Sequence, residues 1–292
     1  MDQLGGILRR VAGQALPRHR RWRRLLRSLP LDPDQLPRPL EAPSERDFII
    51  CGCSRTGTSL LSAVLFRPPN VVTVMEPWDG MRLSPAQLFQ SLRAEIGGEG
   101  MLGRGRLDLH ALREERLVRW SPDGATPLRL ELEPGYLLGV KWPIFWRYLE
   151  LLPTTRFLVC LRHPLEVIAS FKRTGGRLAQ GLDYETAFNR AMNEELGRAA
   201  SDPAERRVLL YDYVHSRLLP HLERPNVMVV RFERWFDDPA GLLGELGDFL
   251  GLELSEERVA LQPPPRETGL SRQEVELIRR RCTTAGALGY PL

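Results

Sequence analysis

Short apolar runs recur along the chain, and each is followed by a segment with a helical pattern. Residues 48–51 and 156–161 are almost wholly apolar, and both runs predict buried strands. Helical stretches follow at 60–65 and 165–171. Strands that alternate with helices favour a parallel sheet with helices on its faces. The chain has 292 residues, which is enough for a single α/β domain with its own core.

The first strand-to-helix turn has the spacing of a phosphate-binding loop. Four residues separate Gly52 from Gly57, and the helical stretch follows at once. Backbone N–H groups and the helix dipole at such a turn can hold an anion. A nucleoside triphosphatase carries a lysine directly after the second glycine, where this chain has Thr58, so the cation of the loop is Arg55. The alternative is an ordinary helix-capping turn, because short motifs also arise by chance.

The second predicted strand-to-helix turn contains another candidate anion site. Arg162 follows the apolar run, and Pro164 suits the first turn of the next helix. Ser170 lies on that helix, where its hydroxyl could share an anion with the guanidinium of Arg162. A magnesium-dependent phosphotransferase would need an aspartate at such a strand end. The arginine argues against a nucleotide kinase or hydrolase, which remains an alternative function.

These motifs resemble those of the sulfotransferases that use 3′-phosphoadenosine 5′-phosphosulfate (PAPS), a family with a P-loop NTPase-like fold. The chain looks like a bacterial member. Residues 54–61 match the loop that binds the 5′-phosphosulfate, with serine where proline is usual at the first position. Residues 162–170 match the Arg…Ser pair that binds the 3′-phosphate. Residues 229–239 and 270–290 are similar to later parts of the family, so the resemblance covers about residues 46–292.

The resemblance implies the residues that bind the PAPS co-substrate. They are Arg55, Thr56, Gly57, Thr58, Ser59, Arg162 and Ser170. Sulfonate transfer builds negative charge on the leaving phosphate oxygen, so we expect Arg55 to be catalytic as well. No metal ion is expected.

Two further residues are candidates for the chemistry. Glu76 follows a predicted strand, and its apolar and aromatic neighbours could make its carboxylate more basic, as a general base for the acceptor requires. Lys141 ends another predicted strand in a Lys-x-Pro element, which the resemblance places near the active centre, where its ammonium could neutralise the transferring sulfonate. The structural alternatives are a strand-end acid before a turn proline and a surface lysine.

The remaining histidines and the cysteines are assigned structural positions. His110 is the reserve base, and His163 is expected to pack or to cap a helix. His215 and His221 lie on helical stretches and are expected at the surface. The four cysteines lack zinc-type spacing and are expected to be buried free thiols.

Basic charge is concentrated at the start of the chain. Residues 1–45 contain nine arginines and five acidic residues, a net charge of +4 that equals the formal charge of the whole chain. We expect a basic, proline-rich arm at 1–45 and the sulfotransferase domain at 46–292. The arm could lie peripherally on an anionic membrane or remain solvated, as charge runs usually do. Nucleic-acid binding is not expected, because no recognised fold accompanies the arm.

The acceptor side is expected in an insert at 78–135. Its residues include Trp78, Phe89, Trp120, Arg104, Arg106 and Arg113, which could form an acceptor pocket and lid or belong to the core. The reaction predicted is transfer to a hydroxyl, with an amine as second choice, of a small-molecule, glycan or lipid acceptor. No apolar stretch predicts a membrane span or a signal peptide, so a cytoplasmic protein is expected. A catalytically inactive, membrane-docked binding protein on the same fold remains an alternative.

Overall fold

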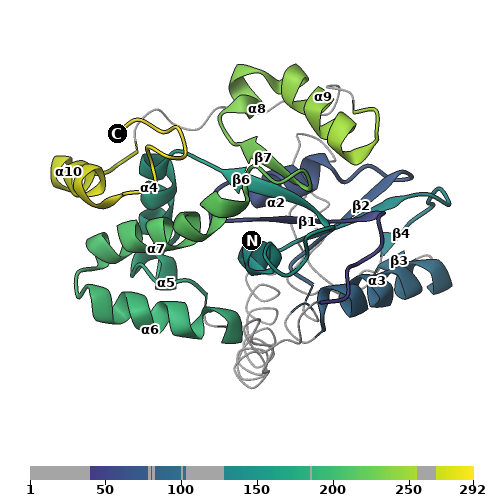
Figure 1. The fold of residues 1–292 in the computed structure, drawn as a ribbon, viewed down its shortest axis with the longest axis horizontal. Helices are drawn as coiled ribbons and strands as arrows, with labels where there is room; N and C mark the ends of the chain where they lie inside the picture. Colours follow the sequence, from purple (N-terminus) through teal and green to yellow (C-terminus); the bar gives the residue numbers. More distant parts are fainter. Residues whose placement is uncertain are drawn as a thin grey trace, which may run out of the picture.

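A central sheet flanked by helices forms the part of the chain that the structure describes (Figure 1). This computed structural model describes residues 40–77, 80, 83–99, 101–102, 128–184, 186–254 and 268–292. The predicted single α/β domain with a parallel sheet is confirmed.

The sheet has five strands among the described residues. They are β1 (Asp47–Gly52), β2 (Val71–Met75), β5 (Leu137–Lys141), β6 (Arg156–Leu161) and β7 (Val227–Arg231). All neighbouring strands are parallel, in the order β2-β5-β1-β6-β7. A separate antiparallel pair is formed by β3 (Met101–Leu102) and β4 (Leu128–Arg129). Because the strands of the main sheet are parallel, their carboxyl ends meet at one edge, where open α/β sheets bind ligands.

Helices connect the strands and cover both faces of the sheet. The longer ones are α2 (Thr58–Val64), α3 (Pro85–Glu99), α4 (Pro164–Thr174), α6 (Arg190–Ala199), α7 (Pro203–Leu218), α9 (Pro239–Leu250) and α10 (Arg272–Arg281). The short ones are α5 (Gly176–Ala179), α8 (Arg234–Asp237), η4 (Pro143–Tyr148), η5 (Ala187–Asn189) and η6 (Leu219–His221). Helices α4, α7 and α9 each begin with proline. Its fixed φ suits the first helical position, where a backbone N–H would have no partner within the helix.

Side chains along each strand alternate between two hydrophobic cores. In β1, Ile49 and Cys51 belong to the larger core, whereas Phe48 and Ile50 belong to the smaller one. Helices α3, α4, α6 and α7 cover the larger core, and α2 and α9 cover the smaller. The apolar runs of the sequence therefore correspond to strands buried on both faces, as is usual in parallel sheets. All four cysteines are buried and free, as predicted.

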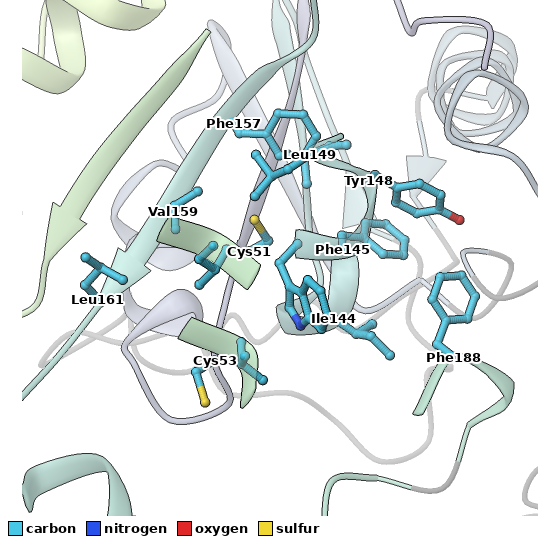
Figure 2. Packing of buried hydrophobic residues seen from close by; sticks show 14 of the residues in the cluster. Cys51, Cys53, Ile144, Phe145, Tyr148, Leu149, Phe157, Val159, Leu161 and Phe188 are labelled. Atoms are coloured by element: carbon cyan, nitrogen blue, oxygen red, sulfur yellow. The ribbon is translucent and has the colours of Figure 1, made fainter. Parts of the chain in front are cut away.

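The larger core contains a group of aromatic rings under the sheet. Figure 2 shows Phe145 and Tyr148 of η4 close to Phe188, with Phe157 of the sheet nearby. The rings of Phe145 and Tyr148 meet edge to face at a centroid distance of 5.1 Å, a favoured geometry for aromatic pairs. Phe89 of α3 is 1% exposed and also lies in this core. Of the two possibilities left open for Phe89, the structure supports the core.

His215 corrects one expectation from the sequence. It was expected at the surface, but it is fully buried on α7, where its ring stacks on Tyr211 at 3.8 Å between centroids. Its Nδ1 lies 2.7 Å from the backbone oxygen of Tyr211, which assigns the proton to Nδ1. Burial lowers the pKa of His215 to about 4. The helical pattern was correct, but the face of the helix that carries His215 turns inward.

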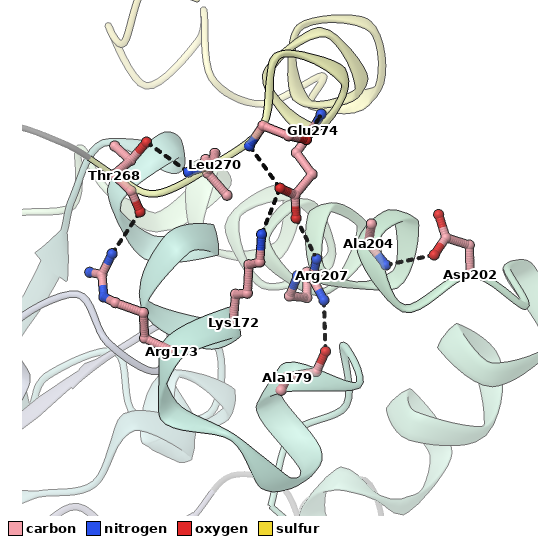
Figure 3. Close-up of polar contacts among 10 residues, drawn as sticks. Lys172, Arg173, Ala179, Asp202, Ala204, Arg207, Thr268, Leu270 and Glu274 are labelled. Carbon is pink, nitrogen blue, oxygen red and sulfur yellow. Dashed lines mark hydrogen bonds and ion pairs between the residues drawn. The ribbon is translucent and has the colours of Figure 1, made fainter.

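The C-terminal helix is fixed by one carboxylate (Figure 3). Glu274 forms a capping box with Ser271 at the start of α10. Its two oxygens also pair with Lys172 of α4 at 2.8 Å and with Arg207 of α7 at 2.9 Å. Although burial opposes it, the bonds from Lys172 and Ser271 lower the pKa of Glu274. One side chain thus connects three helices.

Several positions singled out in the sequence lie outside the described residues. They are Trp78, His110, Trp120, Arg104, Arg106 and Arg113, together with residues 1–39 of the arm. Within the described ranges, no helix is long and apolar enough to cross a membrane.

Candidate active site

A pocket of about 240 Å³ lies at the carboxyl edge of the sheet. Its lining includes the cations Arg55, Lys141 and Arg162, the carboxylate Glu76 and the rings of Tyr184 and Phe232. Of the predicted donor-binding loop, Arg55, Gly57, Thr58 and Ser59 line this pocket. The structure therefore brings together both predicted motifs and both candidates for the chemistry, although they are spread over more than a hundred residues of sequence.

The loop after β1 makes a tight turn that only certain residues allow. Gly57 has φ 100° and precedes α2, and a Cβ atom added there would lie 2.6 Å from the ring of Phe232. Arg55 has φ 74°, a left-handed conformation that is unfavourable for a residue with a side chain. Thr56 is buried, and its hydroxyl donates to the backbone oxygen of Cys53 at 2.7 Å. Thr56 thus stabilises the turn, while its neighbours face the pocket.

Arg55 connects the two motifs directly. Its Nε donates to Ser170 Oγ at 3.0 Å, and Ser170 lies on α4 with 6% of its surface exposed. The sequence suggested that Ser170 shares an anion with Arg162. The Ser170 oxygen accepts this bond from Arg55, which leaves its own O–H available to donate to an anion, so the two predicted anion sites are parts of one arrangement.

Arg162 follows β6 and is almost buried against the pocket wall. One of its terminal nitrogens pairs with Glu166 at 2.8 Å, and its guanidinium carbon lies 3.9 Å from the centroid of the Phe232 ring. Burial lowers the pKa of Arg162, while Glu166 acts in the opposite direction. Among the described residues, no hydrogen-bond partner is found for its buried Nε. The next helix starts at Pro164, capped by His163 through its Nδ1, as the sequence suggested.

Glu76 and Lys141 form an ion pair at the ends of neighbouring strands. Met75 of β2 lies opposite Lys141 of β5, which places Glu76 beside the lysine. Lys141 Nζ lies 2.7 Å from Glu76 Oε1, and the Glu76 backbone N–H donates to the Lys141 oxygen, also at 2.7 Å. Glu76 has φ 47°, a second left-handed residue at the pocket. Lys141 is 3% exposed, so the alternative of a surface lysine is wrong.

Sequence reasoning missed residues that support the pocket from behind. Glu233 accepts hydrogen bonds from the His163 backbone N–H at 2.8 Å and from the Tyr290 hydroxyl at 3.1 Å. Asp183 accepts a bond from Ser54 of the loop at 3.2 Å. Glu233 lay in a segment already recognised as similar to the family, but without a role. No sequence pattern pointed to Asp183, because it lies in an irregular segment between short helices.

Comparisons with known proteins agree with the motifs. A family model described as the sulfotransferase family matches residues 47–256. No curated protein matches the sequence. Within the described residues, no group of three or more His, Cys, Asp or Glu side chains could hold a metal ion.

Similar solved structures are distant. A sulfotransferase from Alicyclobacillus acidocaldarius has 16% sequence identity and a TM-score of 0.45, covering 87% of this chain and 98% of that chain. One from Mycobacterium avium has 17% identity and a TM-score of 0.46, covering 88% and 79%. A mouse sulfotransferase complexed with PAP has 14% identity and a TM-score of 0.32, covering 86% and 69%. Because these scores are below 0.5, the family assignment rests on the family model.

Proposed function

Because the chain belongs to the sulfotransferase family, we propose that it transfers a sulfonate group from PAPS to a hydroxyl of a small-molecule, glycan or lipid acceptor. The observation that carries this proposal is the 3.0 Å hydrogen bond between Arg55 Nε and Ser170 Oγ. It joins the motif after β1 to the motif after β6 at one pocket. A donor that carries both a 5′-phosphosulfate and a 3′-phosphate requires two such motifs held at a fixed separation.

The pocket has the charge that this donor requires. Its lining contains three cations, Arg55, Lys141 and Arg162, and one carboxylate, that of Glu76. Arg162 lines the pocket, and its Nε has no hydrogen-bond partner in the described part of the chain, so its guanidinium keeps unused donor capacity for an anion. Hydroxyl groups of the loop add neutral donors. These residues would hold the phosphosulfate at Arg55 and the 3′-phosphate at Arg162.

Each step of the transfer has a candidate residue. When bound, PAPS supplies a sulfonate whose S–O bond to phosphate breaks while the acceptor oxygen bonds to sulfur. Arg55 then stabilises the negative charge that develops on the leaving phosphate oxygen. Glu76 accepts the proton that the acceptor hydroxyl loses.

The ion pair between Glu76 and Lys141 links the uptake of the acceptor proton to the negative charge on the leaving phosphate oxygen. Before transfer, the lysine ammonium is held by the carboxylate at 2.7 Å. Once Glu76 has taken up the acceptor proton, its attraction for Lys141 falls. The ammonium is then available to the leaving oxygen, which becomes negative in the same step. The pair would thus coordinate deprotonation of the acceptor with departure of the phosphate.

A nucleotide kinase or hydrolase is the competing function. Thr58 stands in place of the triphosphate-binding lysine, and Arg162 stands where a metal-binding aspartate would be needed. Titration calorimetry with adenosine 3′,5′-bisphosphate and with ATP plus magnesium separates the two functions. We expect binding of the bisphosphate without metal; tight, magnesium-dependent binding of ATP would contradict the proposal.

Activity is tested together with the identity of the acceptor. The purified protein would be supplied with isotope-labelled PAPS and an extract of metabolites and lipids, and sulfonated products would be identified by mass spectrometry. The Arg55→Ala protein serves as the control, because its fold should persist while its chemistry is lost. Labelled products that form equally with both proteins would show that the transfer does not depend on this site.

A further inference from the structure

A buried hydrogen bond connects the Arg55 loop to a distant segment of the chain. Ser54 Oγ donates to Asp183 Oδ1 at 3.2 Å across 129 residues of sequence. Both residues are only 5% exposed. Ser54 directly precedes Arg55, so the bond acts one residue away from the cation that the proposed reaction requires.

Asp183 is itself held in place by the neighbouring helices. Its backbone N–H donates to Asn193 Oδ1 of α6 at 2.8 Å, and its backbone oxygen accepts from Asn193 Nδ2 at 3.1 Å. The same oxygen accepts from Arg177 Nε of α5 at 3.0 Å. The next backbone N–H, that of Tyr184, donates to the Asp183 carboxylate at 2.8 Å. The carboxylate is therefore a fixed point for the loop.

The loop needs such a fixed point for two reasons. Arg55 has an unfavourable left-handed φ of 74°, which persists only where the surroundings enforce it. Position 54 also lacks proline, whose ring would restrict the backbone just before the arginine. We propose that Asp183 is a positioning residue that, through Ser54, holds Arg55 in the orientation that binds the donor. This proposal rests on the proposed function, because it concerns the same loop.

The charge of Asp183 should matter to this contact. Burial raises the pKa of Asp183 to about 6. The titratable and charged groups that face it are Glu76 after β2, Arg177 on α5 and Cys53 in the loop, while α6 presents the uncharged Asn193. A hydroxyl donates more strongly to an ionised carboxylate than to a neutral one. The contact should therefore weaken as the pH falls through about 6.

A double-mutant cycle tests the coupling. Affinity for adenosine 3′,5′-bisphosphate is measured by calorimetry at pH 7.5 for the native protein, Ser54→Ala, Asp183→Asn and the double variant. We expect each single change to weaken binding by about threefold to tenfold, and the double change to weaken it no further. The matched control is Thr283→Ala, which removes a hydroxyl that donates to Asp212 at 2.6 Å away from the loop. It should leave affinity unchanged.

Two more readouts distinguish positioning from a purely structural role. The ratio of native to Asp183→Asn affinity should fall toward one at pH 5.5, and this ratio cancels the titration of the ligand phosphates. The raised pKa means that Asp183 favours folding below its unfolded value of 3.8 and loses this contribution as pH rises through about 6. Asp183→Asn should therefore keep or increase the melting temperature at pH 7.5. A lower melting temperature with unchanged affinity would show a structural role only.

Failure of this proposal can be separated from failure of the proposed function. If the native protein does not bind the bisphosphate, the proposed function is wrong, and amide hydrogen exchange of residues 52–60 without ligand still decides the positioning role. Faster exchange in Ser54→Ala and Asp183→Asn than in Thr283→Ala supports it. Equal exchange in all three variants, or additive losses of affinity in the cycle, would overturn it.

Discussion

Two clusters of charged side chains, one around Glu274 and one at the pocket, contain similar residues but differ in what their charges do. At α10, Glu274 accepts bonds from Lys172, Arg207 and the backbone of Ser271, so the cluster binds three helices together. At the pocket, cations outnumber carboxylates in the lining, and they come from the ends of different strands. The first cluster uses its charge to hold the protein together, whereas the second has the excess of positive charge on which the proposed function depends.

The comparison also shows which features do not mark a binding site. Arg162 and Arg207 each have a buried Nε without a hydrogen-bond partner in the described residues. An unpartnered nitrogen is therefore insufficient as a criterion. Arg162 differs because it lines a pocket, together with Arg55 and other residues of the loop after β1. Position, rather than hydrogen bonding alone, separates the two arginines.

The largest effect is expected for Arg55→Ala. Removing one group that stabilises a developing anion typically lowers kcat by about 10²–10³-fold. The matched control is Arg217→Ala, because Arg217 lies on α7 and bonds the backbone oxygen of Tyr213 outside the pocket. Transfer to the identified acceptor is measured under saturating donor. Comparable activity of the two variants would remove Arg55 from the reaction.

Arg162→Ala is expected to act on donor binding. A hydrogen bond to a charged group contributes about 1.5–3 kcal/mol, so affinity for the bisphosphate should fall by about tenfold to a hundredfold. Arg162→Lys should restore only part of it, because an ammonium lacks the planar fork of a guanidinium. Calorimetry provides the measurement. Unchanged affinity in Arg162→Ala would refute the assignment of the second motif.

His215 should contribute to the loss of folding stability at acidic pH. Because its folded pKa is about 4, below the usual 6.5, it favours folding above pH 6.5 and loses this contribution as the pH falls toward 4. Through this group, the free energy of unfolding should fall by about 2 kcal/mol between pH 7 and pH 5. Asp183 changes the stability in the opposite direction over this pH range. The contribution of His215 is therefore isolated by comparing urea unfolding of the native protein and of His215→Gln at both pH values. Identical pH dependence in the two proteins would exclude His215.

Glu274→Gln gives the smallest effect and tests the structural cluster. Loss of the charge weakens the contacts with Lys172 and Arg207, and we expect a loss of about 1 kcal/mol in the free energy of unfolding. Affinity for the bisphosphate should be unchanged. Urea unfolding and calorimetry measure the two properties on one sample. A loss of affinity without a loss of stability would mean that the two clusters are not separate in function.

Much of this arrangement follows from local sequence. The apolar runs identified β1 and β6, and the two motifs identified Arg55, Arg162 and Ser170 because their spacing is set within a single strand-turn-helix unit. Contacts between units could not be predicted in this way. The pair of Glu76 and Lys141 depends on β2 lying beside β5, which is a property of the strand order.

The residues that sequence analysis missed depend on long-range packing. Asp183 reaches Ser54 only because an irregular segment is held against the loop by Asn193 and Arg177. His215 was misplaced because an inward face cannot be recognised from a helical pattern that mixes polar and apolar residues. Local pattern thus predicted several residues that line the pocket, and tertiary packing determined which groups support them.

The ring of Phe232 lies against both motifs. It lies where a side chain on Gly57 would have to be and directly under the guanidinium of Arg162. The loop and the arginine therefore pack against the same ring, and a larger side chain at position 57 would displace the ring that Arg162 contacts. A substitution of Gly57 should therefore also disturb the surroundings of Arg162, even though the two residues belong to different motifs.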